Sequence, residues 1–297
     1  MRRETDKYHL MKVFHAVASK GNFSLAAQHL SMTASSVSKA IKQLESSLNC
    51  RLMNRSTRSL SLTASGKEYL ISVNRILHEI SDIEERIHHQ NTRPSGNLRI
   101  SVPTALGQFF IAPKLHQFIM KYPDITIDLT LNERIVDLVD EGIDVAIRSV
   151  DVNKTSSYYS CSIGSHTKKL VASPDYLETQ SLLHPKELQN KNLLNYTGIN
   201  YTSRWSFNKK GKEVAFVPRA LLNSNNYYTL YCAALNGLGI ANLYQYLVDD
   251  DLSNGRLIHV LPEWQQSHRE LFAIYQQRRE EVPKVDVFIE FLKQLFT

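Results

Sequence analysis

Hydroxyl and ammonium side chains are concentrated in the stretch TASSVSKAIK, which covers residues 33–42. Hydroxyl groups exchange hydrogen bonds with base edges and phosphates, and lysines pair with phosphates, so the stretch has the chemistry of a DNA contact. Apolar residues recur here at helical spacing: Val37, Ile41, Leu44 and Leu48. The hydroxyls and lysines therefore fall on the other side of one helix. That side fits a DNA major groove, and it also fits an ordinary solvated helix face.

Two short helices on either side of residues 31–33 would hold this polar side in place. Thr33 is a suitable N-cap for the second helix, because its hydroxyl accepts an amide proton that the first turn leaves unpaired. We expect Ser24 to cap the first helix in the same way. The short separation is typical of a helix-turn-helix. An earlier helix with apolar residues at helical spacing packs against the pair: Leu10, Val13, Phe14 and Val17.

A basic segment follows the second helix. Arg51, Arg55 and Arg58 lead into the alternating residues 60–62, which predicts a two-stranded wing that lies along phosphates or enters a minor groove. Residues 1–66 contain ten Lys and Arg against three Asp and Glu, a net charge of +7, whereas the whole chain carries +6. Because the rest of the chain is close to neutral, this concentration of charge indicates a nucleic-acid-binding segment.

A long helix is predicted next, from about residue 65 to residue 90, with Thr63 as its N-cap. Its apolar residues alternate spacings of four and three, as in a coiled-coil heptad: Tyr69, Val73, Ile76, Ile80, Ile83 and Ile87. This seam could pack on its own domain, but its regularity and its polar flanks favour the same helix of a second copy. The residues NTRPSG at 91–96 then break the helix.

Beyond the break, strand and helix patterns alternate. Strands are predicted at 98–102, 125–131 and 144–149, with a helix after the first and a short helix at 135–139. A second unit starts near residue 168, with a hairpin at 210–211, a helix over 225–236, a strand after Gly239, another over 270–275 and a closing helix. This order predicts an α/β fold with a largely parallel sheet and helices on both faces. Thr104 opens the first helix, so it is either an anion-binding residue or merely an N-cap.

Residues 10–66 resemble the DNA-binding domain of LysR-type transcriptional regulators. The resemblance rests on the patterns FxxAAxxL, Val-Ser, IxxLE and Leu-Thr-x-x-Gly, met by Phe14, Phe23, Ala26, Ala27, Leu30, Val37, Ser38, Ile41, Leu44, Glu45, Leu52, Arg55, Leu62, Thr63 and Gly66. Residues 54–58 resemble the branch of the family with an RSTR wing. One departure is Ala34-Ser35, where the family often has Gln-Pro. Because alanine cannot read a base, Ser35, Ser38 and Lys39 would carry more of the contact.

Later landmarks resemble the effector-binding domain of the same family: SVPTALGQFFIAP, YPDITIDL, DLVDEGIDVAIR, VASPDYL and AALNGLGIANL. The resemblance implies a winged helix-turn-helix over 1–64, a dimerising linker helix over 65–92 and an effector-binding domain over 93–297. That domain is similar to periplasmic binding proteins. Its first lobe would cover about 97–161 and 267–297 and its second about 162–266, with the ligand between them.

Two sets of candidate site residues follow from the residues and the resemblance together. The candidates for DNA binding are Ser24, Thr33, Ser35, Ser36, Ser38, Lys39, Lys42, Arg55, Thr57 and Arg58. The candidates for effector binding are Thr104, Asn132, Arg148, Ser149, Asn200, Ser224, Asn225 and Ala241. The positive charge of Arg148 favours an anionic or polar metabolite, although a salt bridge to a nearby carboxylate would explain it as well. Ser224 and Asn225 are equally N-cap candidates.

The implied partners are double-stranded DNA with an interrupted inverted repeat, a second copy in a homodimer or homotetramer, a small-molecule effector and RNA polymerase. The sequence has no GxSxG, HExxH or CxxC, so we expect no enzyme, no cofactor and no metal. We expect Cys50, Cys161 and Cys232 to be reduced thiols, and a redox switch between two of them is the alternative. No apolar run approaches a membrane span and no signal peptide is recognised, which favours the cytoplasm. A DNA-organising protein that ignores ligands is the remaining alternative.

Overall fold

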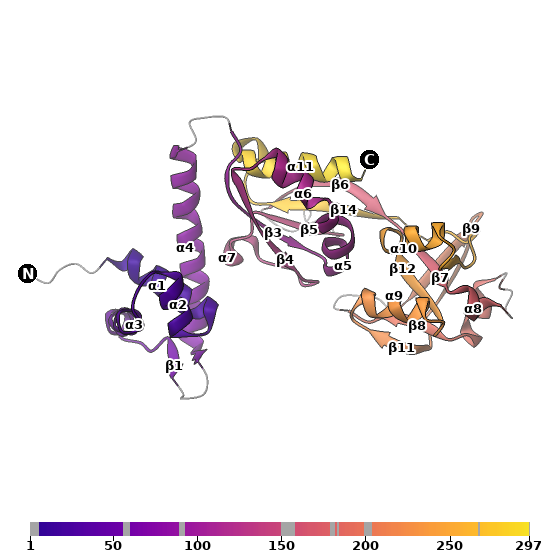
Figure 1. Cartoon of the computed structure of the whole chain (residues 1–297), viewed down its shortest axis with the longest axis horizontal. Coiled ribbons are helices and arrows are strands. Elements are labelled where there is room, and N and C mark those ends of the chain that lie inside the picture. Colours follow the sequence, from indigo (N-terminus) through magenta and orange to yellow (C-terminus); the bar gives the residue numbers. More distant parts are fainter. Residues whose placement is uncertain are drawn as a thin grey trace, which may run out of the picture. The chain divides into compact units, whose positions relative to one another are not determined.

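The computed structural model describes residues 6–55, 60–88, 93–149, 158–178, 182, 184–198, 204–266 and 268–296. It divides into two compact units (Figure 1). The N-terminal unit holds Met1–Arg93 with Asp137–Ile143, and the C-terminal unit holds Pro94–Val136 and Asp144–Thr297. Among the helices described, none is both long enough and apolar enough to cross a membrane.

Four helices and a wing form the described part of the N-terminal unit up to residue 88. Its elements are α1 (Lys7–Lys20), α2 (Phe23–His29), α3 (Ala34–Leu48), β1 (Met53–Arg55), β2 (Leu60–Leu62) and α4 (Ala64–His88). The predicted apolar stripes meet in one core, where Phe14, Val17 and Ile41 have no exposed surface. β1 and β2 pair antiparallel, with Met53 opposite Leu62, so the expected wing has two strands.

The helix caps confirm two predictions and correct one. The Thr33 hydroxyl accepts from the amide of Ser36 at 3.2 Å, and the Thr63 hydroxyl accepts from the amide of Gly66 at 2.9 Å. The N-cap of α2 is Asn22 rather than Ser24. The side-chain oxygen of Asn22 accepts from the amide of Ser24 at 2.7 Å, because the extended backbone at Asn22 points that oxygen along the helix axis. Ser24 is thus an exposed residue of the first turn.

The long helix α4 uses part of its predicted seam inside the N-terminal unit. Val73 is fully buried in the core, and the Tyr69 ring meets the Phe14 ring edge-on at 5.3 Å between centroids. Further along, Ile83 is 41% exposed. The expectation that the whole seam faces a second copy is therefore wrong for its first turns, which complete the core of their own unit.

The first lobe of the C-terminal unit is a five-stranded sheet in the order β4-β3-β5-β14-β6. Its strands are β3 (Gly96–Val102), β4 (Ile125–Leu131), β5 (Val145–Arg148), β6 (Tyr159–His166) and β14 (Arg269–Tyr275). β3 pairs parallel with β4 and β5, whereas β14 pairs antiparallel with β5 and β6. The predicted largely parallel sheet is thus mixed, because β6 and β14 carry the chain between lobes instead of closing a βαβ crossover.

The second lobe repeats this mixed pattern in the order β11-β8-β12-β7-β13. Its strands are β7 (Lys168–Ala172), β8 (Leu193–Tyr196), β11 (Ala220–Ser224), β12 (Ile240–Tyr244) and β13 (Ile258–His259). β8 is parallel to β11 and β12, and β7 is antiparallel to β12 and β13. The predicted hairpin is confirmed as β9 (Trp205–Lys209) and β10 (Lys212–Phe216). Thr167 alone separates β6 from β7, so that residue joins the two sheets.

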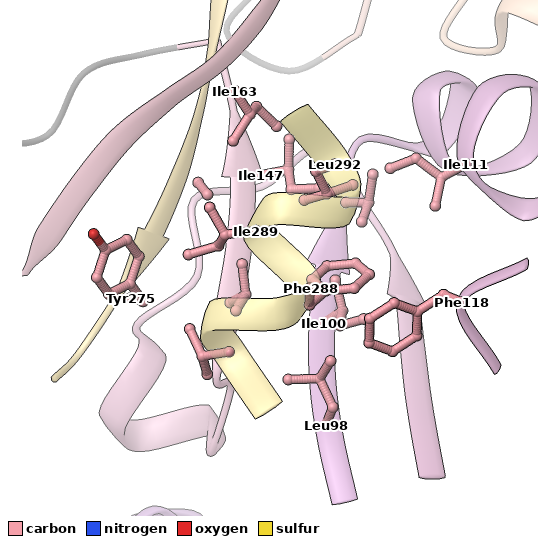
Figure 2. Packing of buried hydrophobic residues seen from close by; sticks show 14 of the residues in the cluster. Leu98, Ile100, Ile111, Phe118, Ile147, Ile163, Tyr275, Phe288, Ile289 and Leu292 are labelled. Carbon is pink, nitrogen blue, oxygen red and sulfur yellow. The ribbon is translucent and has the colours of Figure 1, made fainter. Parts of the chain in front are cut away.

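The remaining helical segments fall in the C-terminal unit, except the one at Leu138–Glu141, which falls in the N-terminal unit. They are α5 (Thr104–Leu106), the π-helical segment η1 (Gly107–Ile111), α6 (Ala112–Lys121), α7 (Leu138–Glu141), α8 (Pro174–Leu177), η2 (Pro185–Asn190), α9 (Tyr227–Leu235), α10 (Gln245–Ser253), η3 (Arg279–Glu281) and α11 (Pro283–Leu295). The short helix α7 begins later than predicted, because Asp137 caps it by accepting from the amides of Val139 and Asp140. Figure 2 shows Phe288, Ile289 and Leu292 of α11 packed beside Ile100 and Ile147 of the first sheet.

Candidate functional site

The exposed side of α3 carries the side chains predicted to contact DNA. Lys39, Lys42 and Ser35 are exposed, while Val37 and Ile41 on the opposite side have no exposed surface. Because Val37, Ile41 and Leu44 of the apolar stripe are buried in the core, with only Leu48 at the end of the helix exposed, the helix is held in one rotation about its axis. The lysines therefore stay on the outside of the unit, where phosphates can reach them.

Hydroxyl groups at the start of α3 form a small network. The Thr33 hydroxyl lies 2.9 Å from that of Ser35 and 2.8 Å from that of Ser36. Ser38, one turn along, is half-buried. Thr33 and Ser36 thus order the first turn, and Ser35 is the exposed hydroxyl in line with Lys39.

Glu45 and Gly66 hold the wing against the helices, a role that sequence reasoning did not assign to them. One carboxylate oxygen of Glu45 accepts from the amides of Leu52 at 2.9 Å and Met53 at 3.1 Å. A Cβ on Gly66 would lie 2.0 Å from the carbonyl oxygen of Leu52, so glycine alone fits there. The signal was present, since both residues belong to the spaced pattern, but spacing does not reveal a contact. Arg55 ends β1, its side chain lies outside the described residues, and so do Thr57 and Arg58.

A hollow lies between the two lobes of the C-terminal unit. Its empty space is about 210 Å³ when the adjoining open solvent is counted, and its cavity volume is about 10 Å³. Its lining comes from both lobes: Thr104, Ala105, Gln108, Phe109, Glu133, Asn225, Asn226, Tyr227 and Tyr228. Thr104 and Asn225 are the predicted effector residues that the fold brings together here. Sequence reasoning missed the others, because aromatic and amide residues in a helix carry no spacing signal for a ligand.

The predicted anion site at Thr104 is already occupied by the chain itself. The amide of Thr104 donates to a carboxylate oxygen of Glu133 at 2.9 Å. An anionic ligand would have to displace that carboxylate from the start of the helix and then lie beside it. The amide of Thr104 itself is therefore not free for the anion that the sequence suggested.

Arg148 is held in the interior of the first lobe. It is 8% exposed, and its guanidinium donates to the carbonyl oxygens of Ser101, Arg134 and Ile147, the Ser101 hydroxyl and the Asn132 side-chain oxygen. These acceptors are neutral and together take the donors of the guanidinium. These hydrogen bonds tie Arg148 to the first lobe, and its role toward an effector stays a prediction. Asn132 is fixed in the same network, and half-buried Ser149 follows Arg148.

The remaining candidates have local structural roles. Asn226, not Ser224 or Asn225, caps α9, and the Ser224 hydroxyl accepts from the Asn226 amide at 3.1 Å. Ala241 is fully buried in β12, so its side chain reaches no ligand. Asn200 lies outside the described residues.

Two basic side chains lie in the aromatic cluster next to the hollow. Lys168 donates to the Tyr227 hydroxyl at 2.7 Å, and its ammonium lies 4.6 Å from the centroid of the Tyr244 ring. Burial, followed by the nearby charge of Arg269, lowers the pKa of Lys168 to about 7, against the opposing effect of Glu133. Burial likewise lowers the pKa of His166 to about 4.

Known proteins resemble this chain along its whole length. Residues 8–67 match the family model of the bacterial regulatory helix-turn-helix protein, lysR family, and residues 91–297 match the LysR substrate binding domain. An uncharacterized HTH-type transcriptional regulator of Haemophilus influenzae is 34% identical, over 92% of this chain and 95% of its own. The HTH-type transcriptional activator AaeR of Escherichia coli is 30% identical, over 96% of this chain and 93% of its own.

Solved structures agree with these sequence relatives. The full-length virulence activator AphB of Vibrio cholerae is 28% identical, with a TM-score of 0.66 over 96% of this chain and 97% of its own. CrgA of Neisseria meningitidis is 28% identical, with a TM-score of 0.62 over 97% of this chain and 98% of its own. The two family models, the relatives and the two-lobed fold agree, and the chain belongs to the LysR family of oligomeric, DNA-binding transcriptional regulators with an effector-binding domain.

Proposed function

We propose that the exposed side of α3 enters the DNA major groove and that the wing holds neighbouring phosphates. The observation that carries this proposal is the fixed rotation of α3, with Ile41 buried and Lys39 exposed. Ser35 and Ser38 would contact bases or phosphates, and Lys39 and Lys42 would pair with phosphates. Arg55, Thr57 and Arg58 would extend the contact along the wing.

Two copies would place their α3 helices on an interrupted inverted repeat. The exposed apolar residue Ile83 supports α4 as the helix that joins them. In this arrangement a homodimer reads one repeat and a homotetramer reads two. The regulator would act in the cytoplasm, in contact with RNA polymerase and without a catalytic step of its own. The proposed domain limits are those of the sequence, with the head over 1–64, the linker helix over 65–92 and the effector domain over 93–297.

The first test is a footprint of the purified protein on the DNA upstream of its own gene. Lys39→Ala should weaken binding and reduce the slope of log affinity against log salt by about one. The matched control is Lys212→Ala, which removes an equally exposed lysine from β10 in the other unit. If both variants bind alike, Lys39 is outside the interface. A protected site with two-fold symmetry supports sequence-specific binding by α3. Diffuse protection that is lost when scrambled competitor DNA is added favours general DNA binding.

The hollow between the lobes is our proposed effector site, because residues of both lobes line it. A ligand held there contacts Thr104 on one lobe and Asn225 on the other, so its affinity depends on how the lobes close. That differential affinity is what a regulatory switch requires. Thr104→Val keeps the backbone amide and should weaken the effector response without changing DNA affinity. Equal loss of both would indicate misfolding and would contradict this placement.

A further inference from the structure

We propose that the hollow selects a small ligand that carries an ammonium group and rejects a carboxylate of the same size. This inference rests on the proposed role of the hollow as the effector site and gives that site a chemical class. Three features of the lining support it: its charge, its aromatic faces and its size.

The charge of the lining is negative. Among the described residues that line the hollow, Glu133 is the one with a full charge. Its carboxylate already accepts from the amide of Thr104 at 2.9 Å, which removes the donor that an anion would use. An ammonium group beside Glu133 gains a charge-assisted hydrogen bond, whereas a carboxylate there meets a like charge.

Aromatic rings from both lobes form a wall of the hollow. Phe109 of the first lobe and Tyr228 of the second are stacked, with centroids 5.8 Å apart and an angle of 22° between the ring planes. Tyr227 adds a third ring. The face of an aromatic ring carries partial negative charge and attracts a cation. The rings therefore add to the selection that Glu133 makes.

The protein already provides one example of a cation held by this aromatic group. The ammonium of Lys168 lies 4.9 Å from the Tyr227 centroid and 4.6 Å from that of Tyr244, and it donates to the Tyr227 hydroxyl. Lys168 also opposes a second cation nearby. Because burial and Arg269 bring the pKa of Lys168 down to about 7, that opposition weakens above neutral pH.

The size of the hollow limits the ligand. Its cavity volume is about 10 Å³, room for roughly one water-sized group, so the hollow would hold the ammonium head of a ligand rather than the whole molecule. The amides of Gln108 and Asn225 supply acceptors for the remaining ammonium protons. The ammonium head of a small aromatic or aliphatic amine fits this limit, with the rest of the ligand in the part of the hollow that is open to solvent. Held between Glu133 on the first lobe and Tyr228 on the second, it would stabilise the closed arrangement of the lobes.

The test uses the full-length protein and matched probes of one skeleton: benzylamine, benzoate and the neutral benzyl alcohol. Calorimetric titration mildly above neutral pH should show benzylamine binding about ten times more tightly than benzoate. Glu133→Gln keeps an oxygen that can accept from the Thr104 amide, so the variant should fold and should bind the three probes with similar affinity. The control Glu213→Gln, an exposed residue of β10, should keep the preference.

Any other result overturns the proposal. A further variant then shows whether only the ammonium class is wrong or whether the hollow is not the effector site at all. Benzoate binding as tightly as benzylamine, a preference that survives Glu133→Gln, or no binding of any probe would each overturn the ammonium class. Asn225→Leu then tests the site itself. If benzoate binds and Asn225→Leu weakens its binding, the hollow is the effector site, but its ligands are anions rather than amines. If Asn225→Leu leaves every bound probe unaffected, the placement of the effector in the hollow fails as well.

Discussion

The DNA-facing side of α3 and the hollow between the lobes are assembled in opposite ways. The first consists of neighbouring residues on one helix, whose rotation is fixed by a buried stripe through Val37 and Ile41. The second combines residues 104–109, 133 and 225–228, which only the folded C-terminal unit brings together. The chemistry of a site made of sequence neighbours can be predicted from the residue types and their spacing. The chemistry of a site assembled from distant segments can be predicted only once the fold shows which residues lie side by side.

Two glycines, one in each unit, differ in whether backbone or a side chain crowds them, and this difference can be tested. In the N-terminal unit, a Cβ on Gly66 would meet the rigid Leu52 carbonyl at 2.0 Å. In the C-terminal unit, a Cβ on Gly107 would meet only a methyl group of Leu131, at 2.2 Å, and that side chain can rotate. Gly66→Ala should therefore lower the unfolding free energy of its unit by about 3 kcal/mol or more and abolish DNA binding.

Gly107→Ala is the matched control for that prediction. The helix propensity gained over glycine, up to about 1 kcal/mol, offsets part of the cost of moving Leu131. Denaturant unfolding of the full chain, followed by DNA titration, measures both variants. Equal destabilisation would mean that the two units tolerate close contact alike.

The interior next to the hollow contains a buried histidine, whereas the described core of the N-terminal unit has no buried histidine. His166 is 9% exposed, its ring lies 4.5 Å from that of Tyr244, and burial, Lys168 and Arg269 lower its pKa from 6.5 to about 4. Because folding lowers the pKa of this histidine, the unfolded chain binds a proton at a higher pH than the folded chain does. The folded state therefore loses stability as the pH falls through that range. Stability contributed by neutral His166 is thus complete above pH 6.5 and is lost as the pH falls towards 4.

Replacing His166 should flatten this acid dependence. His166→Phe keeps a ring against Tyr244. In this variant the unfolding free energy should no longer fall by the amount, on the order of 3 kcal/mol, that the wild type loses between the unfolded and folded pKa values of His166. Calorimetric melting of the full chain across this pH range measures the change, and His116→Gln, at an exposed histidine, serves as control. A wild-type pH profile in the Phe variant would show that other groups govern acid unfolding.

Local signals explain what the sequence could predict and where it could not. Thr33 and Thr63 were recognisable as caps because a cap and its amide lie within three residues. Asn22 and Ser24 are both good capping residues, and only the backbone angles at Asn22 decide between them. Glu133 bonds to Thr104 across 29 positions, and no local pattern predicts that pairing. The antiparallel strands β6 and β14 were harder to place for the same reason, since they pair across more than 100 residues.

The linker helix α4 has one part with a known partner and one part whose partner is predicted. Val73 is buried in its own unit, whereas Ile83 is 41% exposed on the heptad seam. Ile83→Asp should weaken self-association by about 30-fold, the equivalent of about 2 kcal/mol. Ile71→Asp is the control, because Ile71 is 45% exposed on the same helix but off the seam. Sedimentation equilibrium distinguishes the two, and identical association constants would place the dimer contact elsewhere.

The smallest expected effect concerns the carboxylate that joins α3 to the wing. Glu45 accepts from the amides of Leu52 and Met53, and Glu45→Gln keeps one accepting oxygen while removing the charge. The head should lose about 1 kcal/mol of stability, because a charged acceptor is stronger than a neutral one. DNA affinity should fall modestly, since the wing is held less firmly. Urea unfolding compares the stability of Glu45→Gln with that of the control Glu68→Gln, at an exposed position of α4. If both variants are equally stable, the backbone pairing of β1 and β2 suffices to hold the wing, and the precision of the contiguous site depends on α3 alone.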